Sequence, residues 1–192
     1  AENIRLAEGG HYLYDIVTPD GRIEDCRLGI LGKVHIENSI AAVAMIWCAA
    51  KMGGKDLDSA AVAKALEEFA GVKRRMEVYI NTPKQVYIDD YAHHPNEISA
   101  ALSSIKNKYP DHRYTAIFQP HLYTRTRDFA SEFAEALSMV DRLILLDIYP
   151  ARELPIPGVT SQIIFDDVTA PEKVLISKEE LLEYVEETCL GQ

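Results

Sequence analysis

The chain has 192 residues, of which 47% are hydrophobic, and a formal net charge of −10, as expected of a globular protein with a sizeable core. No apolar run approaches the roughly 18 residues of a membrane span, so we expect no membrane partner. The acidic balance argues against a nucleic-acid binder that relies on a broad basic face.

Cysteine usage and the first residues indicate the setting of the protein. Cys26, Cys48 and Cys189 are widely spaced and show neither a disulfide pattern nor a zinc pattern, so we expect a reducing cytoplasm. The sequence begins at Ala1 without an initiator Met or a signal-peptide pattern. We therefore expect a piece of a longer protein.

The first 70 residues predict a hairpin followed by two helices. Extended runs over 11–17 and 22–31 flank the turn sequence Thr18-Pro-Asp-Gly21. A helix over 38–52 is apolar on most sides, so we expect it to lie in a core together with Trp47 and the methionines. Asp58 or Ser59 is expected to cap a second helix, which ends before Gly71.

A domain junction is predicted at 72–76, because the pattern changes there to strands that alternate with helices. The expected strands cover 77–80, 85–89, 114–118, 143–147 and 173–176. The expected helices begin at Pro95, run over 128–139, begin at Thr160 or Ser161, and run over 178–188. This order predicts an α/β fold, a Rossmann-like and mostly parallel sheet with helices on both faces, preceded by a small α+β segment.

Three of the strand-like runs end in functional side chains and are about 30 residues apart, the length of one strand-helix-strand unit. We expect these strands to lie side by side in a parallel sheet, whose carboxyl edge is where such sheets bind ligands. The side chains expected to converge there are Asp89, Asp90, His93, His94, His121, Arg125 and Arg127.

Each of these groups also has a simpler interpretation. Asp89 and Asp90 can coordinate magnesium or accept bonds from ribose, or one of them can merely cap the helix at Pro95. His93 and His94 can bind metal, contact phosphate or shuttle protons, or can be loop residues without a role.

The arginines after the second of these strands also have a functional and a simpler interpretation. Arg125 and Arg127, near a helix N-terminus, suit a carboxylate or phosphate, whereas the simpler alternative is surface pairing with Asp128 or Glu132. Lys73-Arg74-Arg75 follows a helix end, where cations are favourable without any further role.

The chain contains no G-x-x-x-x-G-K-[ST] phosphate loop. Two functions stay open at this point. One is a metal-dependent phosphoesterase with Asp89, Asp90, His93 and His94 as ligands, and the other is a non-catalytic nucleotide-binding module.

Four ordered motifs together resemble the Mur ligase family. They are Gly71-Val-Lys-Arg-Arg-Met76, Ile88-Asp-Asp-Tyr-Ala-His-His-Pro95, Phe118-Gln-Pro-His-Leu-Tyr-Thr-Arg-Thr-Arg-Asp128 and Leu145-Leu-Asp-Ile-Tyr-Pro-Ala151. The resemblance implies that residues 1–75 are the tail of a central ATPase domain and residues 76–192 most of a C-terminal Rossmann-like domain. It also implies that the UDP-substrate domain, the phosphate loop and a closing strand-loop lie outside this sequence.

The resemblance implies an ATP-dependent and magnesium-dependent ligase of peptidoglycan precursor synthesis that forms an acyl phosphate, which an amine then attacks. Gln119-Pro-His121 with Arg125 favours the type that joins L-alanine to UDP-N-acetylmuramate over the sister type that adds a tripeptide. The 192 residues alone are expected to be inactive.

By resemblance, two sets of residues match family positions. Those near the nucleotide are Asn38, Arg75 and Asp90. Those near the amino acid and the reacting phosphate are Tyr91, His93, His121 and Arg125, with His93, His121 and Arg125 expected to be catalytic. The sequence departs from the family pattern at Val34, His35 and Leu122.

Overall fold

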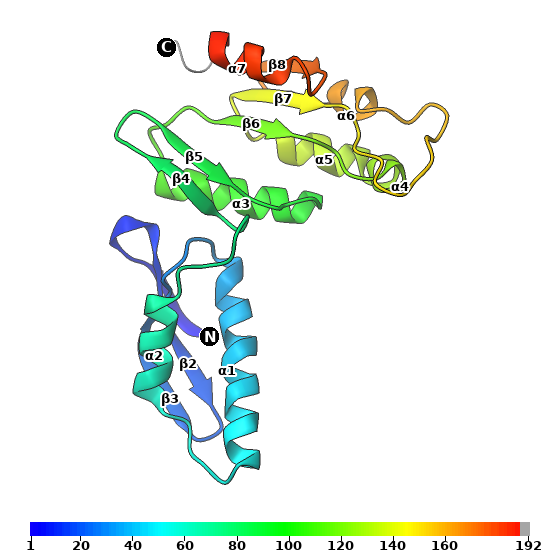
Figure 1. Cartoon of the computed structure of the whole chain (residues 1–192). Helices are drawn as coiled ribbons and strands as arrows, with labels where there is room; N and C mark the ends of the chain where they lie inside the picture. Colours follow the sequence, from blue (N-terminus) through cyan, green and yellow to red (C-terminus); the bar gives the residue numbers. More distant parts are fainter. Residues whose placement is uncertain (189–192) are drawn as a thin grey trace. The chain divides into compact units, whose positions relative to one another are not determined.

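The computed structural model describes residues 1–188 (Figure 1). The chain divides into two compact units. Unit 1 holds residues 1–91 and 103–110, and unit 2 holds residues 92–102 and those from 111 onward. The helix α3 (Pro95–Lys108) therefore contributes to both units. The domain border predicted between residues 75 and 76 concerns the family's domains and stays a prediction.

Unit 1 begins with a three-stranded antiparallel sheet in the order β1-β2-β3. The strands are β1 (Glu2–Leu6), β2 (Tyr12–Thr18) and β3 (Gly21–Arg27), and the short 3-10 helix η1 (Glu8–Gly10) joins the first two. Thr18 pairs with Gly21 at the end of the β2–β3 ladder. The hairpin predicted around the Pro-Asp turn is therefore confirmed, and β1 adds a third strand to it.

Two helices pack on this sheet, α1 (Val34–Met52) and α2 (Ser59–Glu68). The helix α1 begins four residues earlier than the sequence predicted. The carboxylate of Asp58 accepts a hydrogen bond from the Ala61 amide at 3.0 Å, which confirms Asp58 as the cap of α2. The core of this region joins Tyr14 and Ile16 of β2 to Ile36 and Val43 of α1.

The expectation that α1 lies buried on most sides is wrong. Its buried residues are Ile36, Ser39 and Val43, which form one stripe. Met45 is 73% exposed and Met52 is 91% exposed, while Trp47 is half-buried and donates to the Asp20 carboxylate at 2.8 Å. Within residues 1–188 the sheet covers one side of this helix, so its apolar composition did not predict its burial.

The strands β4 (Glu77–Asn81) and β5 (Val86–Asp89) form a two-stranded antiparallel sheet, with residues 82–85 between them. Here the expectation of three runs in one parallel sheet needs correction. β5 pairs with β4, whereas the parallel sheet consists of β6, β7 and β8. The physical reason is local, because a four-residue turn makes β4 the nearest partner for β5.

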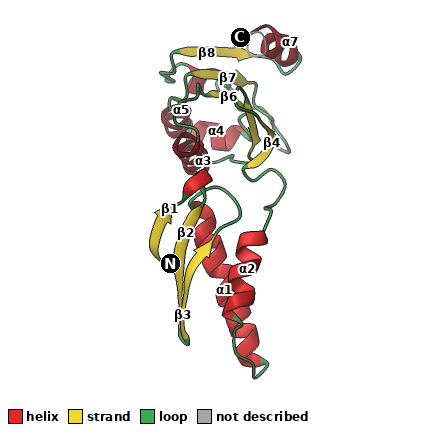
Figure 2. Ribbon diagram, turned by 90° about the vertical axis from the view of Figure 1, so that its left-hand side faces the viewer, coloured by secondary structure: helices red, strands yellow, loops and turns green. Residues whose placement is uncertain are grey.

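Unit 2 contains that parallel sheet, in the order β6-β7-β8, with β6 (Thr115–Phe118), β7 (Arg142–Leu146) and β8 (Glu172–Ile176). Figure 2 shows the three strands one beside the next, with α3 and α5 (Ala130–Leu137) together on one side. Ile98 of α3 and Phe133 of α5 share a core cluster with Leu143 and Leu145 of β7. All five residues of β7 are buried, as expected of a central parallel strand.

The helix predicted over 128–139 corresponds to α5, which begins and ends two residues inside that range. A separate short helix, α4 (Tyr123–Asp128), precedes it, and Phe129 between the two has φ −125°. The short helix α6 (Gln162–Phe165) and the final helix α7 (Leu181–Thr188) complete unit 2. The predicted fold class is confirmed, a parallel sheet with helices preceded by antiparallel strands and helices. No helix among the described residues combines the length and hydropathy needed to cross a membrane.

Candidate functional site

The loop after β6 carries two of the predicted site residues, His121 and Arg125. Pro120 is buried and ends the strand, because proline has no amide to continue a ladder. Leu122 has φ 75° and ψ 133°, which is uncommon for a residue with a side chain. The amide and the hydroxyl of Thr126 both donate to the Leu122 carbonyl, at 3.1 and 2.8 Å, and so start α4.

His93, His121 and Arg125 lie together in unit 2, and we call them the His–Arg group. Arg125 Nη1 lies 3.5 Å from the carbonyl oxygen of His93, at the outer limit of a hydrogen bond. Burial lowers the pKa of His121, and the nearby charges of Arg125 and His93 lower it further, while Glu153 raises it. A neutral imidazole beside a guanidinium can accept a proton next to a bound anion.

Glu97 in the first turn of α3 fixes the backbone that leads to this group. Its carboxylate accepts hydrogen bonds from the amides of His93, at 2.9 Å, and His94, at 3.2 Å. Its Oε2 also lies 3.4 Å from Nδ1 of His93. Sequence reasoning considered an aspartate for the start of this helix and missed Glu97, although a Glu at this position of a first turn is a recognisable signal.

A second set of predicted residues lies in unit 1. Asn38, Arg75, Asp90 and Tyr91 form this set, which we call the Asp–Arg group. The guanidinium carbons of Arg74 and Arg75 lie 4.9 and 5.7 Å from the centre of the Tyr91 ring, within the range of cation–π attraction. The Tyr91 amide donates to the Arg74 carbonyl at 2.7 Å.

Asp90 holds an unusual stretch of backbone. Arg74 and Met76, on either side of Arg75, have φ of 59° and 50°, in the left-handed region. Asp90 Oδ2 accepts a hydrogen bond from the Met76 amide at 2.8 Å. Such conformations persist only where surrounding contacts hold them, so Asp90 contributes to fixing the direction of Arg75.

Asn38 lies in the first turns of α1, three residues after His35. Asn38 Nδ2 lies 3.4 Å from His35 Nδ1, since residues three apart share one helix face. Burial lowers the pKa of His35, Arg75 lowers it further, and Asp90 raises it. His35 therefore lies close to Asn38 and within electrostatic range of Arg75 and Asp90, so it lies beside the Asp–Arg group.

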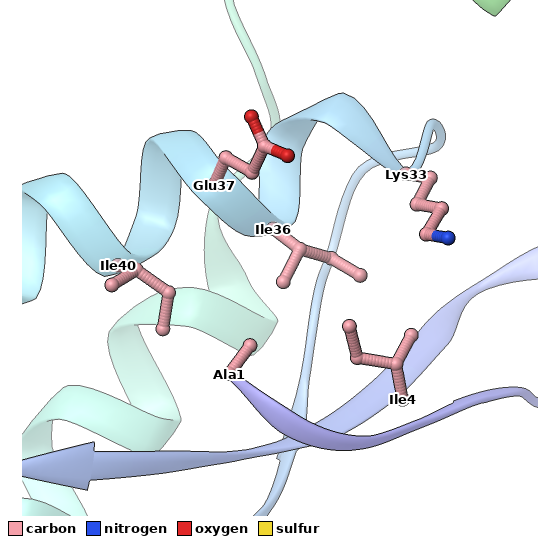
Figure 3. Close-up of a pocket in the computed structure, with 6 residues that line it drawn as sticks. All are labelled: Ala1, Ile4, Lys33, Ile36, Glu37 and Ile40. Atoms are coloured by element: carbon pink, nitrogen blue, oxygen red, sulfur yellow. The ribbon is translucent and has the colours of Figure 1, made fainter.

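The residues around Arg75 suit an anionic ligand. Arg75 lines a hollow of about 420 Å³ that is also lined by Lys73, Lys108 and His11, with Glu77 as the one acid among its lining residues. Several cations around one hollow favour a phosphate group by simple electrostatics. A second hollow of about 350 Å³, between β1 and α1, is lined by Ala1, Ile4, Lys33, Ile36, Glu37 and Ile40 and holds none of the predicted residues (Figure 3).

The other residues expected at the sheet edge have local partners. Arg127 pairs with Asp128 at 2.7 Å with both side chains half exposed, which is the simpler alternative considered for it. The His94 ring packs edge-on against Phe129 at 4.8 Å, and Asp89 lies 3.4 Å from Arg74. Within residues 1–188 no three His, Cys, Asp or Glu side chains are arranged to hold a metal ion.

Sequence reasoning missed Tyr149 and Glu153, which follow β7 in the chain. The Tyr149 ring stacks on the His121 ring, with centres 5.3 Å apart and planes at 26°. Glu153 accepts hydrogen bonds from both the amide and the hydroxyl of Thr124. The available signal was the position of both residues just beyond the strand adjacent to β6.

Comparison with known proteins gives the family. The sequence profile described as "Mur ligase, glutamate ligase domain" matches residues 74–189, more than half of the chain. This chain belongs to the Mur ligase family. The predicted resemblance is thereby confirmed.

Two relatives with high sequence identity share one name. The UDP-N-acetylmuramate–L-alanine ligase of Parabacteroides distasonis is 53% identical over 185 residues, which cover 96% of this chain and 38% of the relative. The enzyme of the same name from Flavobacterium johnsoniae is 47% identical over 182 residues, 95% of this chain and 39% of the relative. The chain thus spans less than two fifths of the length of these relatives.

Solved structures agree on the fold. A UDP-N-acetylmuramate–alanine ligase from Thermotoga maritima matches with a TM-score of 0.72 at 27% identity, over 95% of this chain and 38% of that one. A Mycobacterium tuberculosis folylpolyglutamate synthase complexed with ADP matches with a TM-score of 0.73 at 17% identity, over 96% and 39%. The second likeness supports the fold alone.

Proposed function

We propose that this chain is part of an ATP-dependent ligase that joins L-alanine to UDP-N-acetylmuramate in peptidoglycan precursor synthesis. The names of the relatives at 53% and 47% identity support the substrates. Residues 1–75 belong to a central ATPase domain and residues 76–192 to the C-terminal domain, which agrees with a family match that begins at residue 74. The enzyme works in the cytoplasm, where its ATP is available.

Three residues of the Asp–Arg group, Asn38, Arg75 and Asp90, serve the nucleotide. Arg75 contacts phosphate, and Asp90 and Asn38 bind the nucleoside part by hydrogen bonds. The cations that line the hollow support this assignment, because a phosphate would be attracted to Lys73, Arg75 and Lys108. When bound, magnesium would neutralise the crowded phosphate charge.

The His–Arg group, together with Tyr91, serves the amino acid and the reacting phosphate. Activation of the UDP-N-acetylmuramate carboxylate by ATP gives an acyl phosphate and ADP, and the alanine amine displaces phosphate to form the amide. Arg125 holds the alanine carboxylate, His121 takes up the proton that the attacking amine releases, and His93 donates to the leaving phosphate. The observation that carries this proposal is the contact of His93 and Arg125, with His121 close enough for both to lower its pKa.

The test is the variant Arg125→Ala in the full-length ligase that contains these residues. Loss of a charge-assisted contact to the substrate carboxylate is expected to raise KM for L-alanine by roughly ten-fold to a hundred-fold, with a smaller change in KM for ATP. Arg127→Ala is the matched control, since Arg127 pairs with its neighbour Asp128 at the surface. An unchanged KM for alanine in the Arg125 variant would remove Arg125 from the substrate site.

A further inference from the structure

The segment after β7, residues 147–153, lies along the loop that carries His121 and Arg125. Three of the hydrogen bonds that join the two segments involve the backbone of Asp147 and Tyr149. Tyr149 donates its amide to the Pro120 carbonyl at 2.8 Å and accepts from the Leu122 amide at 3.0 Å. Gln119 Nε2 donates to the Asp147 carbonyl at 3.1 Å. His121 and Tyr149 thus form a parallel bridge that extends the β6–β7 pairing beyond the strands.

The loop needs such support because its backbone is unfavourable on its own. Leu122 is held at φ 75° and ψ 133°, outside the regions that side-chain-bearing residues normally adopt. Conformations of this kind persist only where neighbouring contacts determine them. The bond from the Leu122 amide to the Tyr149 carbonyl acts directly on the strained residue.

Side chains of the same segment contact His121 and the residue before Arg125. The Tyr149 ring stacks on the His121 ring and covers one face of it, although Tyr149 itself is 51% exposed. Glu153 accepts from the Thr124 amide at 2.9 Å and from the Thr124 hydroxyl, which fixes the residue before Arg125. The same bonds lower the pKa of Glu153, so it is a carboxylate at neutral pH.

We propose that Tyr149 and Glu153 are positioning residues, Tyr149 for the His121 imidazole and Glu153 for the turn that presents Arg125. Neither needs to touch a substrate. Their importance for catalysis rests on the proposed function, whereas their effect on His121 and on the α4 turn does not. The two statements can therefore fail separately.

The first arm of the test follows His121 in the 192-residue chain by nuclear magnetic resonance. Tyr149→Ala removes the stacked ring and rehydrates His121, so its pKa is expected to rise by about half a unit. Tyr149→Phe keeps the ring and is expected to leave the pKa unchanged. Tyr87→Ala is the matched control, because Tyr87 is 50% exposed and belongs to β5.

The second arm measures hydrogen exchange at the Thr124 amide. Glu153→Ala removes its acceptor, so exchange is expected to become roughly ten-fold faster, whereas Glu132→Ala on α5 leaves it unchanged. If Tyr149→Ala fails to fold, Tyr149→Leu is used instead. The measurement is then the chemical shift of the His121 ring protons, which should lose the ring-current contribution of Tyr149. A folded Tyr149 variant with unchanged His121 signals, or unchanged exchange at Thr124 in Glu153→Ala, overturns the inference.

The full-length ligase separates the two hypotheses. Tyr149→Ala is expected to lower kcat about ten-fold, with rescue by Tyr149→Phe, and to displace the pH profile of kcat in the direction of the His121 shift. If the two structural readings change as expected but the protein has no alanine-adding activity, the positioning inference stands and the proposed function fails. If the enzyme is active but the structural readings do not change, the inference fails alone.

Discussion

Asp90 has a structural role in addition to its proposed role in nucleotide binding. Its carboxylate accepts a hydrogen bond from the amide of Met76, a residue that is 7% exposed and has φ 50°. Without this acceptor, a poorly hydrated amide loses its partner while the backbone stays strained.

We expect Asp90→Ala to reduce the free energy of unfolding by about 1–3 kcal/mol, the typical cost of a buried donor left without a partner. Urea unfolding of the 192-residue chain measures this. Asp90→Asn keeps an acceptor oxygen and is expected to lose less. Equal stability of wild type and the alanine variant would show that the Met76 amide does not depend on Asp90.

For single residues, the sequence predicted which side chains could bind an anion better than it predicted which neighbours they contact. Arg125, His93 and His121 were predicted to meet, and they do within unit 2. Arg127 was also expected at this edge, yet it pairs with Asp128. Two arginines two residues apart on a helix point to different sides, so a short helix separates their roles.

At the element scale, the first sheet depends on a carboxylate in its middle strand. Asp15 of β2 is 5% exposed and accepts from the Asp25 amide at 3.0 Å, Asn3 Nδ2 at 2.6 Å and Arg22 Nη1 at 2.9 Å. These contacts lower the pKa of Asp15, with the bond from the Asp25 amide as the largest cause. The ionised form is therefore the one that stabilises the fold.

The resulting pH dependence has a definite sign. A lowered folded-state pKa gives stability that is complete above the ordinary aspartate pKa of about 3.9 and is lost as the pH falls through the folded value. We expect Asp15→Asn to have a lower urea midpoint than wild type at pH 7, and a difference that shrinks below about pH 4. Asp25→Asn, which keeps the backbone amide, is the control. A difference independent of pH would rule out the charge of Asp15 as its source.

The strand β7 gives a second prediction at this scale. Ile144 is fully buried and pairs in register with Ile117 of β6, which is 45% exposed. Ile144→Ala removes buried methyl groups and leaves a cavity, so it is expected to cost about 2–5 kcal/mol in the free energy of unfolding. Ile117→Ala, its cross-strand neighbour, is expected to cost less than about 1 kcal/mol. Similar losses for both variants would contradict β7 as the core of unit 2.

At the scale of the whole molecule, the sequence lacks a part that the proposed reaction needs. It contains no G-x-x-x-x-G-K-[ST] loop to cradle a triphosphate, and it spans 38–39% of the length of the Parabacteroides and Flavobacterium relatives.

We therefore expect the 192 residues alone to bind ATP weakly at best and to show no alanine-dependent ATP hydrolysis. Phosphate release, measured with and without L-alanine and UDP-N-acetylmuramate, tests this. The full-length ligase in the same assay is the control. Turnover by the isolated chain that depends on alanine would contradict the prediction.

The sequence by itself predicted the local elements, that is, turns, helix starts and the alternation of strands and helices. The Pro-Asp-Gly turn predicted the β2–β3 hairpin, Asp58 predicted the start of α2, and Pro95 predicted the start of α3. Alternating strands and helices predicted the parallel sheet of unit 2. These features depend on a few neighbouring residues, whose backbone preferences and capping bonds act over short distances.

Long-range partners were decided by folding in three dimensions. α1 is apolar on most sides but buries one stripe, β5 pairs with β4 rather than joining the parallel sheet, and Tyr149 meets His121 although 27 residues separate them. Burial and pairing depend on which distant surface covers a given face, and a hydrophobic pattern records that a face is apolar without recording its partner.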